Sequence, residues 1–325
     1  WRADRPQHGR YQEFFQCDAD VVGSDSLVYE VDFVLLFDEV LSDLKLPGFT
    51  IKINNRKVLS GIAEVSGESD KLVDITVAID KLDKIGEDGV VKELGEKGVK
   101  AEAIDKIRPL FSFSGTNVEK LAKMRIFLES SEVGLQGLEE LEFVLDQVNK
   151  LGLRQAELEF DITLARGLNY YTGAIFEVKA HDVKMGSICG GGRYDDLTGL
   201  FGVPGLPGVG ISFGVDRIYD VMEELKLFPA DVHTGTKLLF FNLGDAESKK
   251  AFELMQQLRN KAVACELFHE NSKFDKQFKY AEKKQIPFIV IIGTKELESG
   301  TCNVKNLSSG VQETLRFEEL LAKFS

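Results

Sequence analysis

Apolar and polar residues recur with two different periods along the chain, and each change of period marks an expected element. From Tyr11 to Val22, strand-forming residues bracket Gln16, Asp18 and Asp20, which share one parity and would face the same side of a strand. From Ser26 to Leu44, apolar residues recur at helical spacing. The start of the chain is therefore predicted to be a strand followed by an amphipathic helix.

The same patterns divide the chain into regions. Residues 1–46 and 156–228 are rich in strand-like apolar runs and contain glycine motifs, whereas residues 47–155 are charged and mostly helical by pattern. A short linker at 229–235 precedes residues 236–325, in which strands and helices alternate. The elements expected there are strand 237–242, helix 246–261, strand 262–268, helix 274–284 and strand 288–293. We therefore expect a discontinuous strand-rich core, a helical insertion within it, and a small α/β domain with a largely parallel sheet.

Length and cysteine usage narrow the class of protein. A chain of 325 residues predicts two domains or slightly more. The four cysteines and four histidines lie far apart with no Cys-x-x-Cys pair, so neither a disulfide framework nor a zinc site is predicted. No apolar run approaches the length that spans a bilayer. We expect no membrane partner and a cytoplasmic location.

The charge is unevenly distributed. The formal net charge is -13, but residues 236–325 contain 14 basic and 12 acidic side chains and carry a net charge of +2. The acidic excess lies in the first 235 residues, with a net charge of -15. Local basic faces rather than the total charge determine whether a protein binds nucleic acid, so the net charge neither supports nor excludes such a partner.

Three segments carry the candidate chemistry. The first supplies Arg2, Arg5 and Arg10, whose guanidinium groups suit phosphate and carboxylate, although a solvated edge hairpin is the alternative for this segment alone. The second, Arg166–Gly173, lies between two strand-like stretches. The third, Gly190–Arg217, is glycine-rich and ends at the opening of a helix, where backbone N–H groups can bind an anion. Its glycines fit neither Gly-x-x-x-x-Gly-Lys-Ser/Thr nor Gly-x-Gly-x-x-Gly, which disfavours a generic nucleotide-binding protein.

Together these segments resemble the histidyl-tRNA synthetase family of class II aminoacyl-tRNA synthetases. Arg2–Gly23 is similar to motif 2, Arg166–Gly173 to the histidine-specific block, and Gly190–Arg217 to motif 3. The resemblance implies an α+β class II catalytic core with a mostly antiparallel sheet, formed by residues 1–46 and 156–228. It also implies a helical insertion and a C-terminal α/β domain of the anticodon-binding type. For that last domain, a scaffold or dimer-stabilising role is the alternative.

The resemblance further implies a ligase that activates histidine with ATP to histidyl-adenylate, releases pyrophosphate and transfers histidine to tRNA(His). Arg2 matches the arginine on the α-phosphate, and Arg217 matches the one that reaches the terminal phosphates. Arg166 matches a third catalytic arginine beside the α-phosphate and the histidine carboxylate. The other expected ATP-binding residues are Arg10, Gln16 and Gly214. Mg²⁺ is expected to arrive with ATP, without a metal site built from protein ligands alone.

Histidine recognition is expected to depend on a carboxylate and a phenol. An imidazole presents one donor and one acceptor, and Asp20 and Tyr171 match the positions that face its two nitrogens. Gln16 matches a position that contacts the α-amino end. The remaining expected histidine-binding residues are Arg166 and Tyr170. Purely apolar side chains would leave these polar groups unpaired.

The sequence departs from the family pattern in two places. Asn169 stands where an aspartate is common, and the chain begins inside motif 2, so motif 1 is expected to be missing. We therefore expect impaired activity in the chain by itself and a homodimer in the complete protein. The alternative function is a non-catalytic histidyl-tRNA-synthetase-like regulatory subunit that senses histidine. The presence of Arg2, Arg166 and Arg217, and of the C-terminal domain, argues against it.

Overall fold

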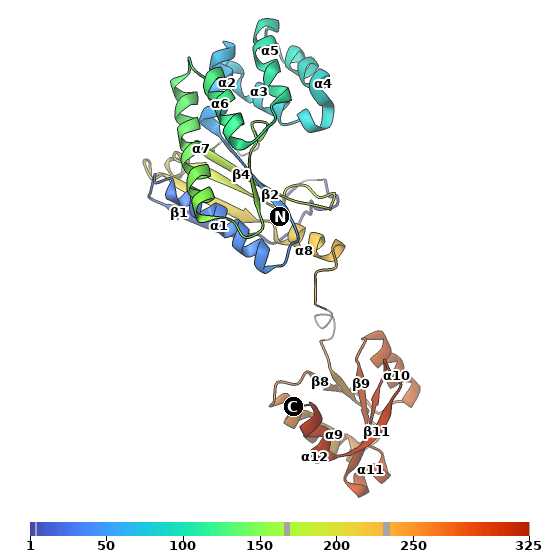
Figure 1. The fold of residues 1–325 in the computed structure, drawn as a ribbon. Coiled ribbons are helices and arrows are strands. Elements are labelled where there is room, and N and C mark those ends of the chain that lie inside the picture. Colours follow the sequence, from blue (N-terminus) through green and yellow to red (C-terminus); the bar gives the residue numbers. More distant parts are fainter. Residues whose placement is uncertain (4, 166–169, 230–234, 325) are drawn as a thin grey trace. The chain divides into compact units, whose positions relative to one another are not determined.

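The computed structural model describes residues 1–3, 5–165, 170–229 and 235–324. It divides the chain into two compact units, Trp1–Leu227 and Phe228–Ser325. Each unit is built around its own sheet (Figure 1).

The first unit contains a six-stranded sheet with the strand order β1-β6-β5-β4-β2-β3. Its strands are β1 (Cys17–Val22), β2 (Phe49–Asn55), β3 (Glu157–Phe160), β4 (Ala174–Ala180), β5 (Cys189–Tyr194) and β6 (Gly208–Phe213). Its helices are α1 (Val28–Asp43), α2 (Arg56–Ser66), α3 (Leu72–Ile79), α4 (Leu82–Glu96), α5 (Ala101–Ile107), α6 (Asn117–Phe127), α7 (Glu132–Leu151) and α8 (Val215–Glu224). Short 3-10 turns are η1 (Ser69–Lys71), η2 (Arg108–Ser112) and η3 (Leu197–Phe201). All neighbouring strands are antiparallel except the parallel pair β2 and β3, which confirms the expected α+β core.

The two faces of this sheet differ in chemistry. Helices α1 and α7 pack beside each other on one face (Figure 1), where Phe37 of α1 is fully buried and lies edge-on to Phe176 and Phe213. On the other face, one row of paired positions crosses all six strands: Asp18, Ser212, Gly190, Glu177, Lys52 and Glu159. The apolar face therefore forms the core, and the polar face is available to a ligand.

The region expected as a helical insertion, 47–155, differs from that expectation at both ends. Its first residues form β2, whose alternation places Ile51 and Ile53 fully buried on one face, and this short run pairs with β4 and β3. Strand β2 passes directly into α2 because the side chain of Asn55 caps the helix by accepting from the backbone N–H of Lys57. Helix α7 packs on β2, β4 and α1, so the end of this region also belongs to the core.

The first strand is shorter than expected. It begins at Cys17 rather than Tyr11, because the preceding residues form polar contacts with α8. The hydroxyl of Tyr11 donates to Asp220 at 2.6 Å, and the backbone N–H of Phe15 donates to Asp216 at 2.7 Å. These tertiary contacts hold the segment from Tyr11 to Phe15 against α8.

The second unit contains a five-stranded sheet with the strand order β11-β10-β9-β7-β8. Its strands are β7 (Leu238–Phe240), β8 (Cys265–Leu267), β9 (Phe288–Ile291), β10 (Thr301–Asn306) and β11 (Gln312–Arg316). Its helices are α9 (Asp245–Arg259), α10 (Phe274–Lys283), α11 (Thr294–Ser299) and α12 (Phe317–Phe324). Strands β8, β7 and β9 are parallel as expected, whereas β10 and β11 add an antiparallel hairpin. The expectation of a largely parallel sheet therefore holds for only three of the five strands.

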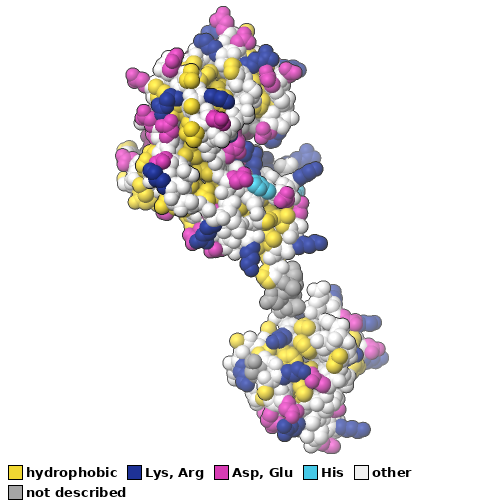
Figure 2. Space-filling model, viewed as in Figure 1, with side chains coloured by type: hydrophobic (Ala, Val, Ile, Leu, Met, Phe, Trp, Pro, Cys, Tyr) yellow, Lys and Arg dark blue, Asp and Glu magenta, His cyan; other side chains and the backbone are white. Residues whose placement is uncertain are grey.

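The surface carries charges of both signs. Figure 2 shows basic and acidic side chains spread over the visible face of both units. Within the described residues, the structure contains no helix that is both long enough and apolar enough to cross a membrane.

Candidate active site

A cavity of about 280 Å³ opens in the first unit. Its lining comes from the loop before β1, from β4, β5 and β6, from the loops beside them, and from the start of α8. The expected site residues in this lining are Arg2, Gln16, Tyr171, Gly214 and Arg217. Arg166 lies outside the described residues. Segments that are far apart in the sequence thus meet at one cavity.

The missing side chains of two glycines leave room for neighbouring site residues. A Cβ atom on Gly210 would lie 1.9 Å from Oδ1 of Asp20, and one on Gly192 would lie 2.9 Å from the ring of Tyr171. No Cβ atom tolerates contacts this short without a shift of its neighbour. These two positions in the glycine-rich strands therefore allow Asp20 and Tyr171 to occupy their observed places.

Two arginine side chains, Arg2 and Arg217, line the cavity. Arg217, in the first turn of α8, donates from Nε to the carbonyl of Gly9 at 2.6 Å and from Nη1 to the carbonyl of Ser187 at 2.5 Å. The guanidinium of Arg2 lies 4.3 Å from the centre of the Phe14 ring, a cation–π contact. Arg10 lines an adjoining recess of about 40 Å³ together with Arg2 and Arg217. This concentration of positive charge suits a polyanionic ligand.

A carboxylate and three phenols lie together in a cluster that reaches the cavity through Tyr171. Asp20 is exposed rather than part of the cavity lining, and it accepts a hydrogen bond from the hydroxyl of Tyr194 at 2.5 Å. Tyr170 stands edge-on to Tyr171 at 4.8 Å and to Tyr194 at 6.2 Å between ring centres.

Two of these phenols are held in the protonated form. Burial, followed by the interaction with Tyr170, raises the pKa of Tyr171 above its ordinary value. Burial, followed by the hydrogen bond to Asp20, raises the pKa of Tyr194. Tyr171 and Tyr194 therefore keep their protons at neutral pH and can donate hydrogen bonds.

Gln16 lies immediately before β1 and contacts the polar row of the sheet. Its Nε2 donates to Oγ of Ser212 at 2.9 Å and reaches Oδ1 of Asp18 at 3.4 Å. These contacts orient the side-chain amide beside the cavity.

Three residues in or beside the cavity were not among the predicted site residues. Tyr194 and Ser212 bond to predicted site residues, and Glu177 is a buried carboxylate in the cavity lining. The available signal for Tyr194 was the alternation of side chains along β5. Residues 190, 192 and 194 lie on one face of this strand, so Tyr194 shares its face with two glycines of motif 3. A charge inside the apolar run Ala174–Val178 was the available signal for Glu177.

The described side chains form neither a metal-binding cluster nor a disulfide. Among the described residues, no group of three or more His, Cys, Asp or Glu side chains is placed to hold a metal ion. All four cysteines are free, and only Cys17 is exposed.

A mostly antiparallel six-stranded sheet, with arginines from a motif 2 loop and a motif 3 helix converging on one cavity, defines a class II aminoacyl-tRNA synthetase core. The family model for histidyl-tRNA synthetase matches residues 1–218, and the model for the anticodon binding domain matches residues 237–325. The chain belongs to the histidyl-tRNA synthetase family, whose members are aminoacyl-tRNA ligases.

Individual relatives agree with this assignment. The histidine–tRNA ligase of Flavobacterium johnsoniae is 59% identical over 321 residues, which cover 98% of this chain and 68% of that protein. The histidine–tRNA ligase of Christiangramia forsetii is 56% identical over 321 residues, covering 98% of this chain and 70% of that protein. Among solved structures, histidyl-tRNA synthetase from Nostoc sp. PCC 7120 superposes with a TM-score of 0.80 at 33% identity, covering 96% of this chain and 74% of that one.

Proposed function

We propose that this protein activates histidine with ATP and transfers it to tRNA(His), and that the cavity described above is where activation takes place. One observation carries the proposal. Arg2 and Arg217, from segments at opposite ends of the first unit's sequence, line the same cavity as Tyr171. Asp20 interacts electrostatically with Tyr171 and accepts a hydrogen bond from Tyr194, so Tyr171 joins the arginine-lined cavity to a carboxylate and a further phenol.

Activation brings two anions together. The histidine carboxylate attacks the α-phosphorus of ATP, and pyrophosphate leaves. Positioned cations offset the repulsion and the charge that develops on the phosphoryl oxygens. We assign Arg2 to the α-phosphate and Arg217, with Arg10 and Gly214 beside it, to the rest of the triphosphate. Arg166 is assigned to the α-phosphate on the family resemblance alone, and Mg²⁺ bound to ATP shares the charge.

Histidine is recognised in this proposal by Asp20 and Tyr171. The carboxylate accepts from one imidazole nitrogen, and the phenol, which its raised pKa keeps protonated, donates to the other. Tyr170 packs edge-on against Tyr171 and restricts its ring. The amide oxygen of Gln16 is assigned to the α-amino group, since its Nε2 already donates to Ser212.

The second unit is assigned to tRNA. The match of residues 237–325 to the anticodon binding domain supports a role in binding the anticodon of tRNA(His). We also propose that the complete protein forms a homodimer, as the family resemblance implies.

The test is ATP–pyrophosphate exchange with the natural full-length protein. We expect exchange that depends on histidine and that falls by roughly a hundredfold or more in Arg217→Ala. Arg154→Ala is the control, because Arg154 bonds to Glu39 and Asp43 at the surface and does not line the cavity. Melting temperatures equal to that of the unmodified protein would show that both variants are folded.

Two results would contradict the proposal. Unchanged exchange in a folded Arg217→Ala variant would remove this arginine from the reaction. Histidine binding without exchange in the unmodified protein would favour the regulatory-subunit alternative instead.

A further inference from the structure

The proposed histidine site needs a fixed distance between Asp20 and Tyr171, yet these residues belong to separate segments. Arg193 connects the two segments. It is the neighbour of Tyr194 in β5, so the two side chains lie on opposite faces of the sheet. Tyr194 reaches Asp20 on the polar face, whereas Arg193 lies beneath the sheet, against α1.

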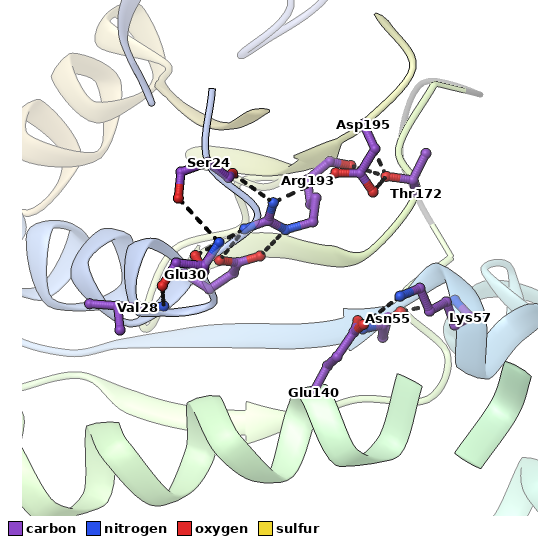
Figure 3. A network of polar contacts seen from close by, with 10 residues as sticks. Ser24, Val28, Glu30, Asn55, Lys57, Glu140, Thr172, Arg193 and Asp195 are labelled. Carbon is purple, nitrogen blue, oxygen red and sulfur yellow. Dashed lines mark hydrogen bonds and ion pairs between the residues drawn. The ribbon is translucent and has the colours of Figure 1, made fainter. Parts of the chain in front are cut away.

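On one side, Arg193 holds the segment that follows β1. Its guanidinium pairs with Glu30 of α1 through Nε to Oε1 and through Nη2 to Oε2, the latter at 2.7 Å (Figure 3). It also donates to the carbonyls of Ser24 and Ser26, each at 3.2 Å. Glu30 is 0% exposed and Arg193 only 4%, so this network is shielded from solvent. The segment leaving the strand of Asp20 is therefore attached to Arg193.

On the other side, Arg193 holds the residues that follow Tyr171. Its carbonyl accepts from the backbone N–H of Thr172 at 2.8 Å. The hydroxyl of Thr172 donates to Oδ2 of Asp195 at 2.6 Å and accepts from the Asp195 N–H at 3.0 Å (Figure 3). Oδ1 of Asp195 lies 3.6 Å from Nη1 of Arg193, which closes the loop of contacts. A Cβ atom on Gly173 would lie 2.9 Å from Cδ of Arg193, so the backbone there packs directly on the arginine stem.

We propose that Arg193 is a positioning residue for histidine recognition, which sets the spacing between Asp20 and Tyr171 without contacting the amino acid. This inference rests on the proposed function. The charge-assisted, bidentate contact with a rigid helix gives the guanidinium one geometry, and both segments of the site are fixed to it. The relative placement of Asp20 and Tyr171 is thereby fixed from the core of the unit.

The test must separate positioning from simple stabilisation. Arg193→Ala would leave Glu30 buried without a counter-charge and is expected to unfold, so it is not informative. Thr172→Val keeps the volume and removes the hydroxyl contacts with Asp195, together with a 3.5 Å contact to the carbonyl of Arg193. Thr50→Val is the matched control, because Thr50 lies in the same sheet, loses a 2.8 Å contact with His181, and does not line the cavity.

We expect Thr172→Val to raise the KM for histidine in pyrophosphate exchange by roughly tenfold or more, since small misplacements weaken an oriented site. The KM for ATP should change by less than about twofold, and Thr172→Ser should restore the histidine KM. Thr50→Val should change neither KM. A histidine KM in Thr172→Val equal to that of Thr50→Val, or an equal rise for ATP and histidine, would overturn the inference.

A double-variant cycle tests the role of Arg193 directly. Arg193→Lys keeps a positive charge beside Glu30 but loses the bidentate geometry. If both variants loosen the same segment, the combined rise in histidine KM will be smaller than the product of the separate rises. A combined rise in histidine KM equal to the product of the separate rises would show that Arg193 does not act through Thr172. Absence of exchange in the unmodified protein would instead reject the proposed function.

Discussion

At the residue scale, the absence of a side chain at two glycines determines how the proposed site is arranged. Two glycines provide room for the proposed histidine-binding groups, since Gly210 lies against Asp20 and Gly192 against Tyr171. Their strands therefore supply both backbone pairing and free space on the polar face.

Gly210→Ala should weaken histidine binding with little effect on stability. The new Cβ would lie 1.9 Å from Oδ1 of Asp20, and this flexible carboxylate can rotate away with the loss of its one hydrogen bond from Tyr194. The histidine KM should rise by about tenfold to a hundredfold, because the misplaced carboxylate no longer meets the imidazole. Gly199→Ala is the control, since its Cβ would approach only Pro204, at 3.7 Å. Equal histidine KM values for the two variants would contradict the role of Asp20.

The raised pKa values of Tyr171 and Tyr194 predict that the stability of the folded protein depends on pH in the alkaline range. Both phenols bind their protons more tightly in the folded state than in the unfolded state. Their contribution to stability is therefore fully present below the ordinary tyrosine pKa of 10.0 and is lost as pH rises above it.

Tyrosinate absorbance between about pH 10 and 11 can check this prediction. The folded protein should show less ionised tyrosine than the denatured protein. Tyr171→Phe and Tyr194→Phe should each reduce that difference by about half a tyrosine at pH 10 and by about 0.9 tyrosine at pH 11. A difference that both variants leave unchanged would mean that these phenols titrate normally.

At the scale of elements, the sheet is attached to α1 by charge as well as by apolar packing. The pair Glu30 and Arg193 is buried between α1 and β5, whereas Glu39 of the same helix meets Arg154 at the surface. Burial decides how much each pair affects stability, because an uncompensated charge is costly only where water cannot reach it.

Glu30→Ala should reduce the free energy of unfolding of the first unit by about 3–5 kcal/mol, since Arg193 would remain buried without its counter-charge. Glu39→Ala, on the same helix, should cost no more than about 1 kcal/mol. Chemical denaturation monitored by circular dichroism measures both values. Similar losses in the two variants would show that burial of the Glu30 pair has no special effect.

At the scale of the whole molecule, the second unit has its own core on both faces of its sheet. One apolar cluster gathers side chains of α9 and α12, including Leu254 and Leu320, and another contains Phe268 and Ala281. Both faces of the five-stranded sheet are therefore covered by residues of this unit alone.

Residues 236–325 should consequently fold when expressed separately. We expect a cooperative unfolding transition and dispersed amide signals in an NMR spectrum of this fragment. In the complete chain, Glu30→Ala should shift the unfolding of the first unit and leave that of residues 236–325 unchanged. An unfolded fragment would show that the second unit depends on the rest of the chain.

Local spacing in the sequence was enough to predict much of this protein. The shared parity of Asp18 and Asp20 placed them on one face of β1, and apolar spacing placed Arg217 in the first turn of α8. Helices α1, α9 and α10 begin and end within two residues of their predicted bounds. These features follow from the geometry of single strands and helices, which depends on neighbouring residues.

Only the tertiary structure decided the features that join distant segments. The sequence pattern placed the residues of β2 in a helical region, whereas their pairing with β3 and β4 places them in the sheet. The bond between Tyr194 and Asp20 spans 174 residues, and that between Arg193 and Glu30 spans 163. Periodicity reports which face of its own element a residue occupies, but not which residue of another element it meets. The sequence by itself therefore determined the family and most candidate residues, whereas sheet order and packing decided which side chains complete the site and hold it in place.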